Sequence, residues 1–193
     1  MSYRSAPEDL ALHGVRVLGF ATASRVAARY RLDGDTVEES LLDYEALGWV
    51  GRSSFAGSSG WSITEAGRVE NERRLAAELD RAGARETVVS AHGAFLSLNE
   101  RLAKACTDWR WDERVLRALA SVGASLDTLC AGLTERLTRF DGYAQSYTAA
   151  LREVDAGGRA WVDAPDLESC HTVWIRFHED LLATLGIPRG SDT

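Results

Sequence analysis

The sequence predicts a mainly α-helical protein in two parts, with one short pair of strands in the first part. Apolar residues recur at helical spacing along most of the 193-residue chain. The exception is residues 49–63, where a glycine- and serine-rich tip separates two short apolar runs, as in a β-hairpin. We therefore expect a domain at residues 8–82 that contains the hairpin, and an all-helical domain at residues 83–188.

The overall composition is that of a globular protein, with 45% hydrophobic and 26% charged residues. We expect a cytoplasmic protein without a membrane segment, because no apolar run reaches about 18 residues and the N-terminus lacks the apolar core of a signal peptide. The three widely spaced cysteines, Cys106, Cys130 and Cys170, are typical of reduced thiols. The net charge of −7 argues against a general affinity for nucleic acid.

Four helices are expected in the first domain, because proline, Thr/Ser caps and glycine mark their ends. The apolar residues between these marks fall on one face of each helix. The helices are expected from Pro7 to Gly19, from Thr22-Ala-Ser24 to Tyr30, from Asp35 to Leu47 with Gly48 as its C-cap, and from Thr64 to about Asp80. A turn is expected at Asp33-Gly34-Asp35 between the second and third helices.

The hairpin completes a recognisable order of elements. One strand opens at Trp49-Val50, residues 55–60 form the tip, and Trp61-Ser-Ile63 returns. Three helices, a two-stranded wing and a following helix are the order of a winged helix-turn-helix. That module is the one most often used to hold double-stranded DNA.

The second domain is predicted to be a helical bundle that serves as a dimerisation half. Helices are expected at residues 84–106, 112–138 and 140–154, and a last one is expected to begin at Asp163-Ala-Pro165-Asp166. The second of these carries a seam of apolar residues suited to packing within its own bundle or across a dimer axis. The seam consists of Val115, Leu119, Val122, Leu126, Leu129 and Leu133.

Two segments of the first domain resemble MarR-type transcriptional regulators. The stretch TVEESLLDYEALGWV at residues 36–50 resembles their recognition helix and first wing strand, and WSITEAGR at residues 61–68 resembles the second wing strand and the next helix. The segments SCHTVW at residues 169–174 and HEDL at residues 178–181 are similar to the tails of actinobacterial regulators. The resemblance implies a homodimer that reads a palindromic operator and responds to a small-molecule effector.

Ten residues are candidates for contact with DNA. Arginines just before the third helix suit phosphates, and polar groups on that helix suit base edges. The alternatives are a solvated helix end for the arginines and a capping role for the threonine of the third helix. The candidates are Thr22, Ser24, Arg25, Arg29, Arg31, Thr36, Glu39, Ser40, Asp43 and Arg52.

The charge of the predicted recognition helix departs from the family pattern. Residues 35–47 hold five acidic side chains and no basic one, and residues 1–81 hold ten basic and thirteen acidic residues, a net charge of −3. Carboxylates near phosphates are repelled, so we expect weak, salt-sensitive DNA binding. The alternative is a winged-helix interaction or small-molecule-sensing protein that does not bind DNA.

Candidate ligand-binding residues lie in the second domain. His171, Trp174 and His178 share one face of the last helix, with His92 as a partner from the first bundle helix. Trp109 and Trp111 at the helix break line a pocket or pack as a hinge. The alternative for the histidines is a hydrogen-bonded place beside an apolar seam. No metal or other cofactor and no enzymatic activity are expected, because the sequence has neither zinc-ligand spacing nor a nucleophile-elbow motif.

Overall fold

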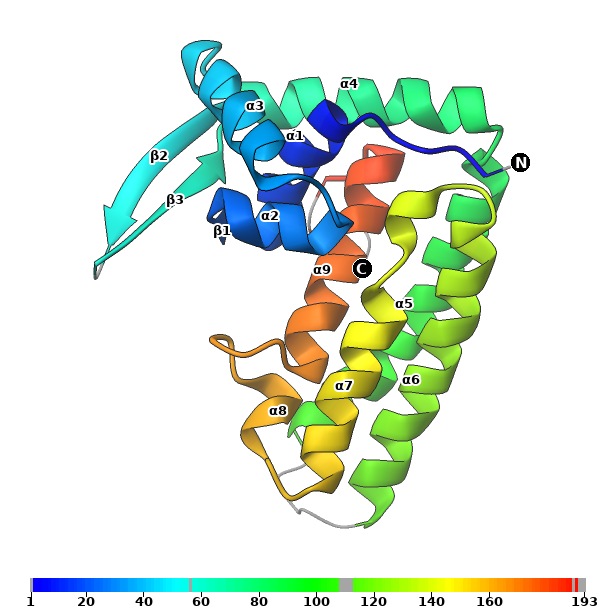
Figure 1. The fold of residues 1–193 in the computed structure, drawn as a ribbon. Coiled ribbons are helices and arrows are strands. Elements are labelled where there is room, and N and C mark those ends of the chain that lie inside the picture. The colour runs from blue at the N-terminus through cyan, green and yellow to red at the C-terminus, as the bar shows by residue number, and fades with distance from the viewer. Residues whose placement is uncertain (1, 56, 108–112, 189, 191–193) are drawn as a thin grey trace. The chain divides into compact units, whose positions relative to one another are not determined.

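The computed structural model describes residues 2–55, 57–107, 113–188 and 190 (Figure 1). It is mainly helical, with 73% helix, nine α-helices in the described residues and a small three-stranded antiparallel sheet. The chain divides into two compact units. The N-terminal unit comprises Tyr3–Ala84 together with the chain from Leu182 onward, and the helical unit comprises Arg85–Leu181 together with the first two residues.

The N-terminal unit contains four helices whose starts follow from local chemistry. Pro7 occupies the first turn of α1, where its missing N–H costs nothing. The side chains of Thr22, Asp33 and Thr64 each accept a hydrogen bond from the backbone N–H three residues further on. The helices are α1 (Pro7–Leu18), α2 (Ala23–Tyr30), α3 (Gly34–Ala46) and α4 (Glu65–Ala82).

The sheet has one more strand than the sequence predicted. The strands β1 (Phe20–Ala21), β2 (Val50–Phe55) and β3 (Ser58–Ile63) pair antiparallel in the order β1-β3-β2. A strand of two residues has no alternating pattern to detect, so β1 was missed. The expected hairpin tip at residues 55–60 is also wrong in extent, because the ladder continues to the pair Phe55–Ser58.

The limits of α3 differ from the prediction at both ends. The expected turn at residues 33–35 is the start of the helix, because the Asp33 carboxylate caps it and Gly34 already lies within it. Leu47 is the C-cap, and Gly48 follows it with a φ of 73°. A left-handed glycine just beyond the cap is the common way to end a helix.

An apolar core cluster lies in the N-terminal unit, with contributions from its first three helices and all three strands. Gly67 marks the tightest approach in this unit. A Cβ at this position would lie 1.9 Å from the backbone oxygen of Trp49, so only glycine allows α4 to start so close to the chain that enters β2. The core consists of Ala11, Leu12, Val15, Ala21, Ala23, Val26, Ala27, Val37, Leu41, Tyr44, Val50 and Trp61.

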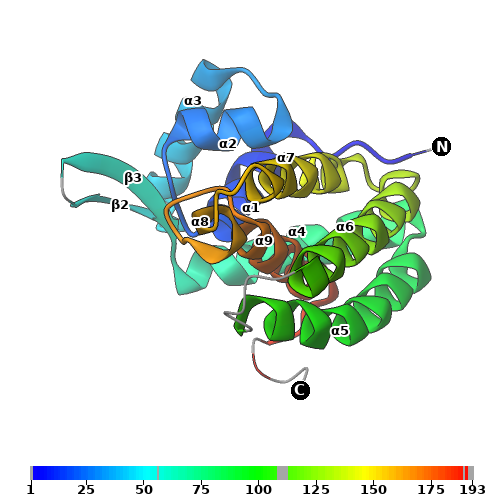
Figure 2. The same cartoon turned by 90° about the horizontal axis from the view of Figure 1, so that it is seen from below.

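The helical unit is built around α5, α6 and α7, which lie side by side (Figure 2). Val115, Leu119, Val122, Leu126 and Leu133 of the predicted seam are buried within the unit. The seam therefore packs inside its own chain and is not a free surface for dimerisation. The elements are α5 (Arg85–Thr107), α6 (Glu113–Thr134), the 3-10 turn η1 (Thr138–Phe140), α7 (Tyr143–Asp155), α8 (Ala160–Asp163) and α9 (Cys170–Leu185).

Two predicted boundaries in this unit are wrong. The helix expected to reach residue 138 ends at Thr134, and η1 follows it. The last helix does not begin at residues 163–166, where the short α8 ends. It begins at Cys170, because the Ser169 hydroxyl accepts a hydrogen bond from the Thr172 N–H at 3.2 Å and caps it.

A buried ion pair joins distant segments of the helical unit. The Arg139 guanidinium on η1 donates to the Asp180 carboxylate on α9, and the Tyr143 hydroxyl donates to the same carboxylate at 2.8 Å. Both charged side chains are at most 1% exposed. A buried charge requires a partner of this kind, so the contact fixes η1 and α7 against α9.

Candidate nucleic-acid interface

The helix pair α2–α3 carries most of the predicted DNA-binding residues. Three residues, 31–33, connect the two helices. Val37, Leu41 and Tyr44 direct α3 into the core. The opposite face of α3 is therefore its outward face, and it contains Glu39, Leu42, Asp43 and Ala46 at helical spacing.

Ser40 does not belong to the outward face, which corrects the prediction that it faces bases. Its side chain is buried, and its hydroxyl donates to the Thr36 backbone oxygen at 2.8 Å. The Thr36 hydroxyl donates to the Asp33 carboxylate at 3.0 Å, so Thr36 takes part in the helix cap. The backbone N–H of Thr36, followed by its hydroxyl, lowers the pKa of Asp33.

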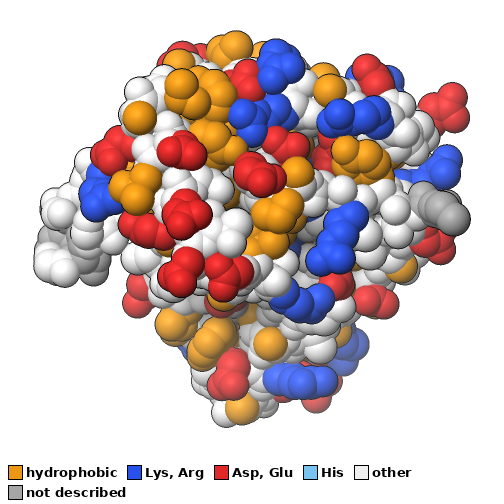
Figure 3. Space-filling model, turned by 45° about the horizontal axis from the view of Figure 1, so that its top comes forward, with side chains coloured by type: hydrophobic (Ala, Val, Ile, Leu, Met, Phe, Trp, Pro, Cys, Tyr) orange, Lys and Arg blue, Asp and Glu red, His pale blue; other side chains and the backbone are white. Residues whose placement is uncertain are grey.

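The outward face of α3 is acidic and apolar. Glu39, Asp43 and Glu45 are exposed on it or beside it, and no basic residue occurs in the helix. Leu42 is 46% exposed, and Leu47 at the C-cap is 58% exposed. Figure 3 shows acidic side chains with apolar ones between them beside the base of the hairpin. A phosphate backbone would meet negative charge on this face.

The basic candidates lie on α2 and at its end. Arg25 is exposed, and its guanidinium donates to the Phe20 backbone oxygen at 3.5 Å. Arg29, one turn later, lies 4.8 Å over the Tyr30 ring. Arg31 is the exposed C-cap of α2, with a left-handed φ of 55°. These three arginines give α2 a basic side that α3 lacks.

Two further predicted hydroxyls lie at the start of α2. The Thr22 side chain caps the helix, and its oxygen lies 2.8 Å from the Ser24 hydroxyl oxygen. Ser24 is exposed. A helix N-terminus with an exposed hydroxyl suits a phosphate, because its first N–H groups point outward.

Arg52, the cation of the predicted wing, contacts Trp61 and Glu38 of its own unit. Its guanidinium lies 4.2 Å over the Trp61 ring, its direct partner across the ladder, and 3.5 Å from the Glu38 carboxylate. Stacking and the ion pair both hold it at the base of the hairpin. It is therefore poorly placed to reach beyond the hairpin tip.

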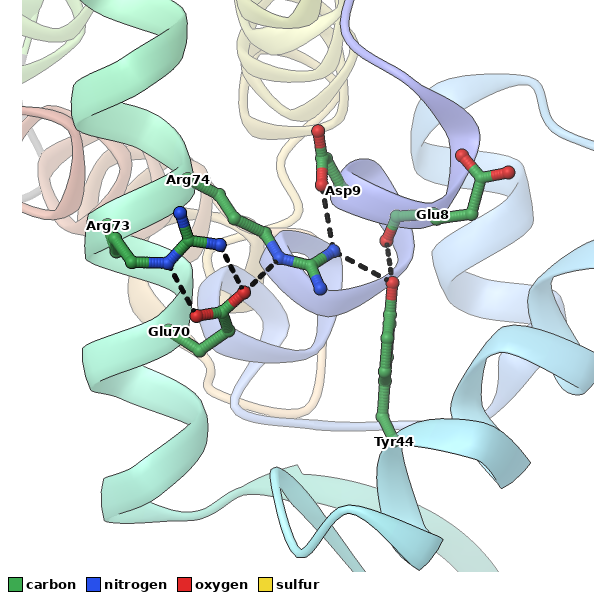
Figure 4. A network of polar contacts seen from close by, with 6 residues as sticks. All are labelled: Glu8, Asp9, Tyr44, Glu70, Arg73 and Arg74. Atoms are coloured by element: carbon green, nitrogen blue, oxygen red, sulfur yellow. Dashed lines mark hydrogen bonds and ion pairs between the residues drawn. The ribbon is translucent and has the colours of Figure 1, made fainter.

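A polar network that sequence reasoning missed joins three helices of the N-terminal unit (Figure 4). The Arg74 guanidinium on α4 donates to Asp9 on α1 at 2.8 Å, to the Tyr44 hydroxyl on α3 at 3.0 Å and to Glu70 at 2.7 Å. The Tyr44 hydroxyl in turn donates to the Glu8 backbone oxygen at 3.0 Å. The network fixes the orientation of α3 relative to α1 and α4.

Electrostatics in this network favour the charged forms of Glu70 and Arg74 and the neutral form of Tyr44. The hydrogen bond from Arg73, with a further one from Arg74, lowers the pKa of Glu70 from 4.5 to about 2. Burial opposes the charge of Arg74, but its hydrogen bonds to Glu70 and Tyr44 hold its pKa above the ordinary value. Burial raises the pKa of Tyr44. All three groups thus remain in fixed protonation states near neutral pH.

Three of the predicted ligand-binding residues come together in the helical unit. The rings of His92 and His178 stack with centroids 6.1 Å apart, and Phe95 stacks on both His178 and Trp174 at 4.5 Å. The Trp174 indole N–H donates to the Asn99 side-chain oxygen at 2.9 Å. Sequence reasoning missed Phe95 as the centre of this cluster, although its place on the apolar face of α5 was visible.

The remaining ligand candidates are less informative. His171 lies half-buried in the first turn of α9, seven residues before His178. Trp109 and Trp111 lie outside the described residues. In the described part of the chain, no three His, Cys, Asp or Glu side chains gather as a metal site requires.

The cysteines offer little reactivity. Burial raises the pKa of Cys106 to about 11 and that of Cys170 to about 12, so both are thiols near neutral pH. Cys130 is likewise a buried thiol.

Among the described helices, α6 has the length and hydropathy of a membrane span, a test that the core helix of a bundle also passes.

Comparison with known proteins found no matching family model, no matching curated protein and no matching solved structure.

Proposed function

We propose that residues 8–82 form a winged helix-turn-helix and that the chain is an effector-responsive transcriptional regulator that holds double-stranded DNA as a homodimer. The observation that carries the proposal is the order α1-β1-α2-α3-β2-β3-α4 with the strand order β1-β3-β2. A short connection joins α2 and α3, and the β2–β3 hairpin follows directly, as a wing does. The resemblance of residues 36–50 and 61–68 to MarR-type regulators supports the same proposal.

In this proposal, arginines on α2 supply the affinity for DNA. Arg25 and Arg31 are exposed, and Arg29 lies on the same helix one turn after Arg25. Guanidinium groups bind phosphate oxygens through paired hydrogen bonds. Since α3 offers only carboxylates and leucines, binding is dominated by phosphate contacts and falls steeply with salt.

The test is a titration with the DNA upstream of the protein's own gene and with a random duplex, at 50 and 200 mM salt. The wild type is expected to retain the upstream DNA selectively at the lower concentration. The Arg25→Ala, Arg29→Ala double variant should bind more weakly. Its log–log salt slope should be smaller by roughly two for each protomer, since each phosphate that an arginine neutralises adds about 0.9 to the slope.

A charge-matched control is Arg114→Ala with Arg117→Ala, two exposed arginines of α6 in the helical unit. That variant should bind DNA as the wild type does. An equal loss of affinity in both variants would show a general charge effect and remove α2 from the interface. An absence of selective retention at low salt would contradict the regulator itself.

The effector site of this proposal is the aromatic cluster around Phe95 in the helical unit. His92 and His178 bring polar ring nitrogens to this cluster, the kind of group that small-molecule sites combine with aromatic rings. Phe95 and Trp174 are buried and stacked on each other, so in this proposal the effector binds at the edge of the cluster or opens it. An effector changes DNA affinity only if it binds one conformation of the dimer more tightly than another.

A second candidate function is a winged-helix protein that binds another protein and not DNA. The observation that favours it is the outward face of α3, where exposed Leu42 and Leu47 lie among carboxylates. Exposed leucines do not contribute to phosphate contacts, whereas apolar side chains on a helix face are used in helix-to-protein contacts. The titration above separates the two candidates.

A further inference from the structure

We propose that the outward face of α3 is a docking surface for a basic, amphipathic segment of a partner protein. The surface consists of Glu39, Leu42, Asp43, Ala46 and Leu47. This inference deepens the second candidate function by giving the chemical class of the partner. It is carried by two independent properties of the same face, its exposed apolar side chains and its single sign of charge.

The apolar part of the surface lies on the C-terminal half of α3. Leu42 and Ala46 are four residues apart on α3, and Leu47 follows directly at the C-cap. Leu42 and Leu47 are two of the large apolar side chains that the described N-terminal unit leaves exposed, at 46% and 58%. Leu42 and Leu47 lie on neighbouring sides of the end of α3, so a partner segment that crosses this end can contact both with its own apolar side.

The charged part of the surface determines the kind of partner. Glu39 and Asp43 lie one turn apart on the outward face of α3, and Glu45 lies beside that face. Glu38, the acid nearest the hairpin, is already paired with Arg52 at 3.5 Å. The carboxylates beside the leucines are thus placed to bind cations from outside the unit. A partner with lysine or arginine along the edges of an apolar stripe satisfies both properties.

The rigidity of α3 favours such docking. The Arg74 network holds Tyr44 on the inner side of the helix, and the Tyr44 ring packs 5.3 Å from the Trp49 ring. Asp33 caps the N-terminus of the same helix. The leucines therefore stand on a helix whose position is fixed before the partner arrives, which lowers the entropic cost of binding.

Docking on this face and DNA binding through α2 use the same helix pair. Because α2 packs against α3, a segment that covers α3 lies beside the helix that would hold DNA, so we expect the partner and DNA to compete. This would make the partner an antagonist of DNA binding if the chain is a regulator. The docking itself does not depend on DNA binding.

The experiment uses the full chain and a fluorescein-labelled 14-residue amphipathic leucine–lysine peptide as the probe. An alanine–lysine peptide of the same length and charge is the matched probe without anchors. Fluorescence anisotropy should give at least tenfold tighter binding of the leucine peptide. The Leu42→Ser, Leu47→Ser double variant should weaken it at least tenfold and leave the alanine peptide unchanged.

The matched control variant is Val69→Ser, which removes an apolar side chain 62% exposed on α4. It should bind the leucine peptide as the wild type does, and thermal unfolding of each variant checks that the fold is intact. Equal binding of the two peptides, equal weakening in the Val69 variant or no binding at 1 mM peptide would overturn the docking surface. DNA binding measured on the same samples tests the regulator separately, because the serine variants keep all α2 arginines.

Discussion

The helical unit encloses an ion pair completely, whereas the N-terminal unit keeps its Arg74 network partly exposed. Both units leave large apolar side chains exposed, Val89 and Ile175 in the helical unit and Leu42, Leu47 and Val69 in the N-terminal unit. In the helical unit, the apolar seam of α6 is buried and the Arg139–Asp180 pair is enclosed. In the N-terminal unit, α3 directs its inner face into the core but leaves leucines and carboxylates exposed on the other. Burial of the apolar seam contributes to stability, whereas the exposed leucines of α3 contribute little and leave an apolar surface open to a partner. The proposed partner contact on α3 therefore depends on the carboxylates around its leucines and not on apolar exposure alone.

The polar networks of the two units differ in how far water reaches their charged side chains. Asp180 is fully enclosed with its arginine, whereas Asp9 in the Arg74 network has a side chain 34% exposed. Water therefore screens the second network and not the first. Removal of one partner should be costly in the helical unit and mild in the N-terminal unit.

The largest expected effect is that of Asp180→Ala. It leaves the Arg139 guanidinium buried without its carboxylate and should lower the free energy of unfolding by roughly 3–5 kcal/mol. The matched variant Asp9→Ala should cost about 1 kcal/mol or less. Urea denaturation of both variants gives the two values, and equal decreases would remove the distinction between the units.

The next effect concerns pH and Glu70. Its pKa in the folded protein is about 2, below the ordinary 4.5, so its ionised form stabilises the fold above pH 4.5. This contribution disappears as the pH falls from 4.5 toward 2. Glu70→Gln should therefore be less stable than the wild type at pH 7, and the difference should shrink below pH 4.5.

Urea denaturation at pH 7, 5, 4 and 3 measures this dependence. Glu100→Gln, which changes an exposed carboxylate on α5, is the control and should run parallel to the wild type. A constant difference between Glu70→Gln and the wild type across this range would mean that the ion pairs of Glu70 contribute nothing to folding.

The smallest expected effect on stability is that of Glu39→Gln with Asp43→Asn. Both side chains are exposed on α3, so the free energy of unfolding should change by no more than about 0.5 kcal/mol. Non-specific DNA binding should become tighter, because two repulsive charges per protomer are removed. Unchanged DNA affinity would mean that α3 does not approach the phosphates.

Local signals in the sequence predicted much of the N-terminal unit. Pro7, Thr22 and Thr64 mark helix starts through chemistry contained within a few residues. The same kind of signal misled at Pro165, where a cap, a proline and acids precede a turn and not α9. The cap that starts α9 is Ser169, four residues later, so the correct signal was local as well but competed with a stronger-looking one.

The candidate sites were less predictable, because their contacts are distant in sequence. Arg74 and Asp9 are 65 residues apart, and Trp174 and Asn99 are 75 apart. Helical spacing correctly grouped Trp174 with His178, but it could not identify Phe95 as the ring between them. Helical spacing also failed to separate Ser40 from the outward face, since a small polar side chain such as serine occurs on both the buried and the exposed side of a helix.

The central claim is that partner binding belongs to the helix pair α2–α3, with DNA held by α2. The most direct measurement is a titration of the isotope-labelled chain with the upstream duplex, followed through backbone amide shifts. The largest shifts are expected at Ser24, Arg25, Arg29 and Arg31. Shifts concentrated in the helical unit, or no shifts in α2, would contradict the claim.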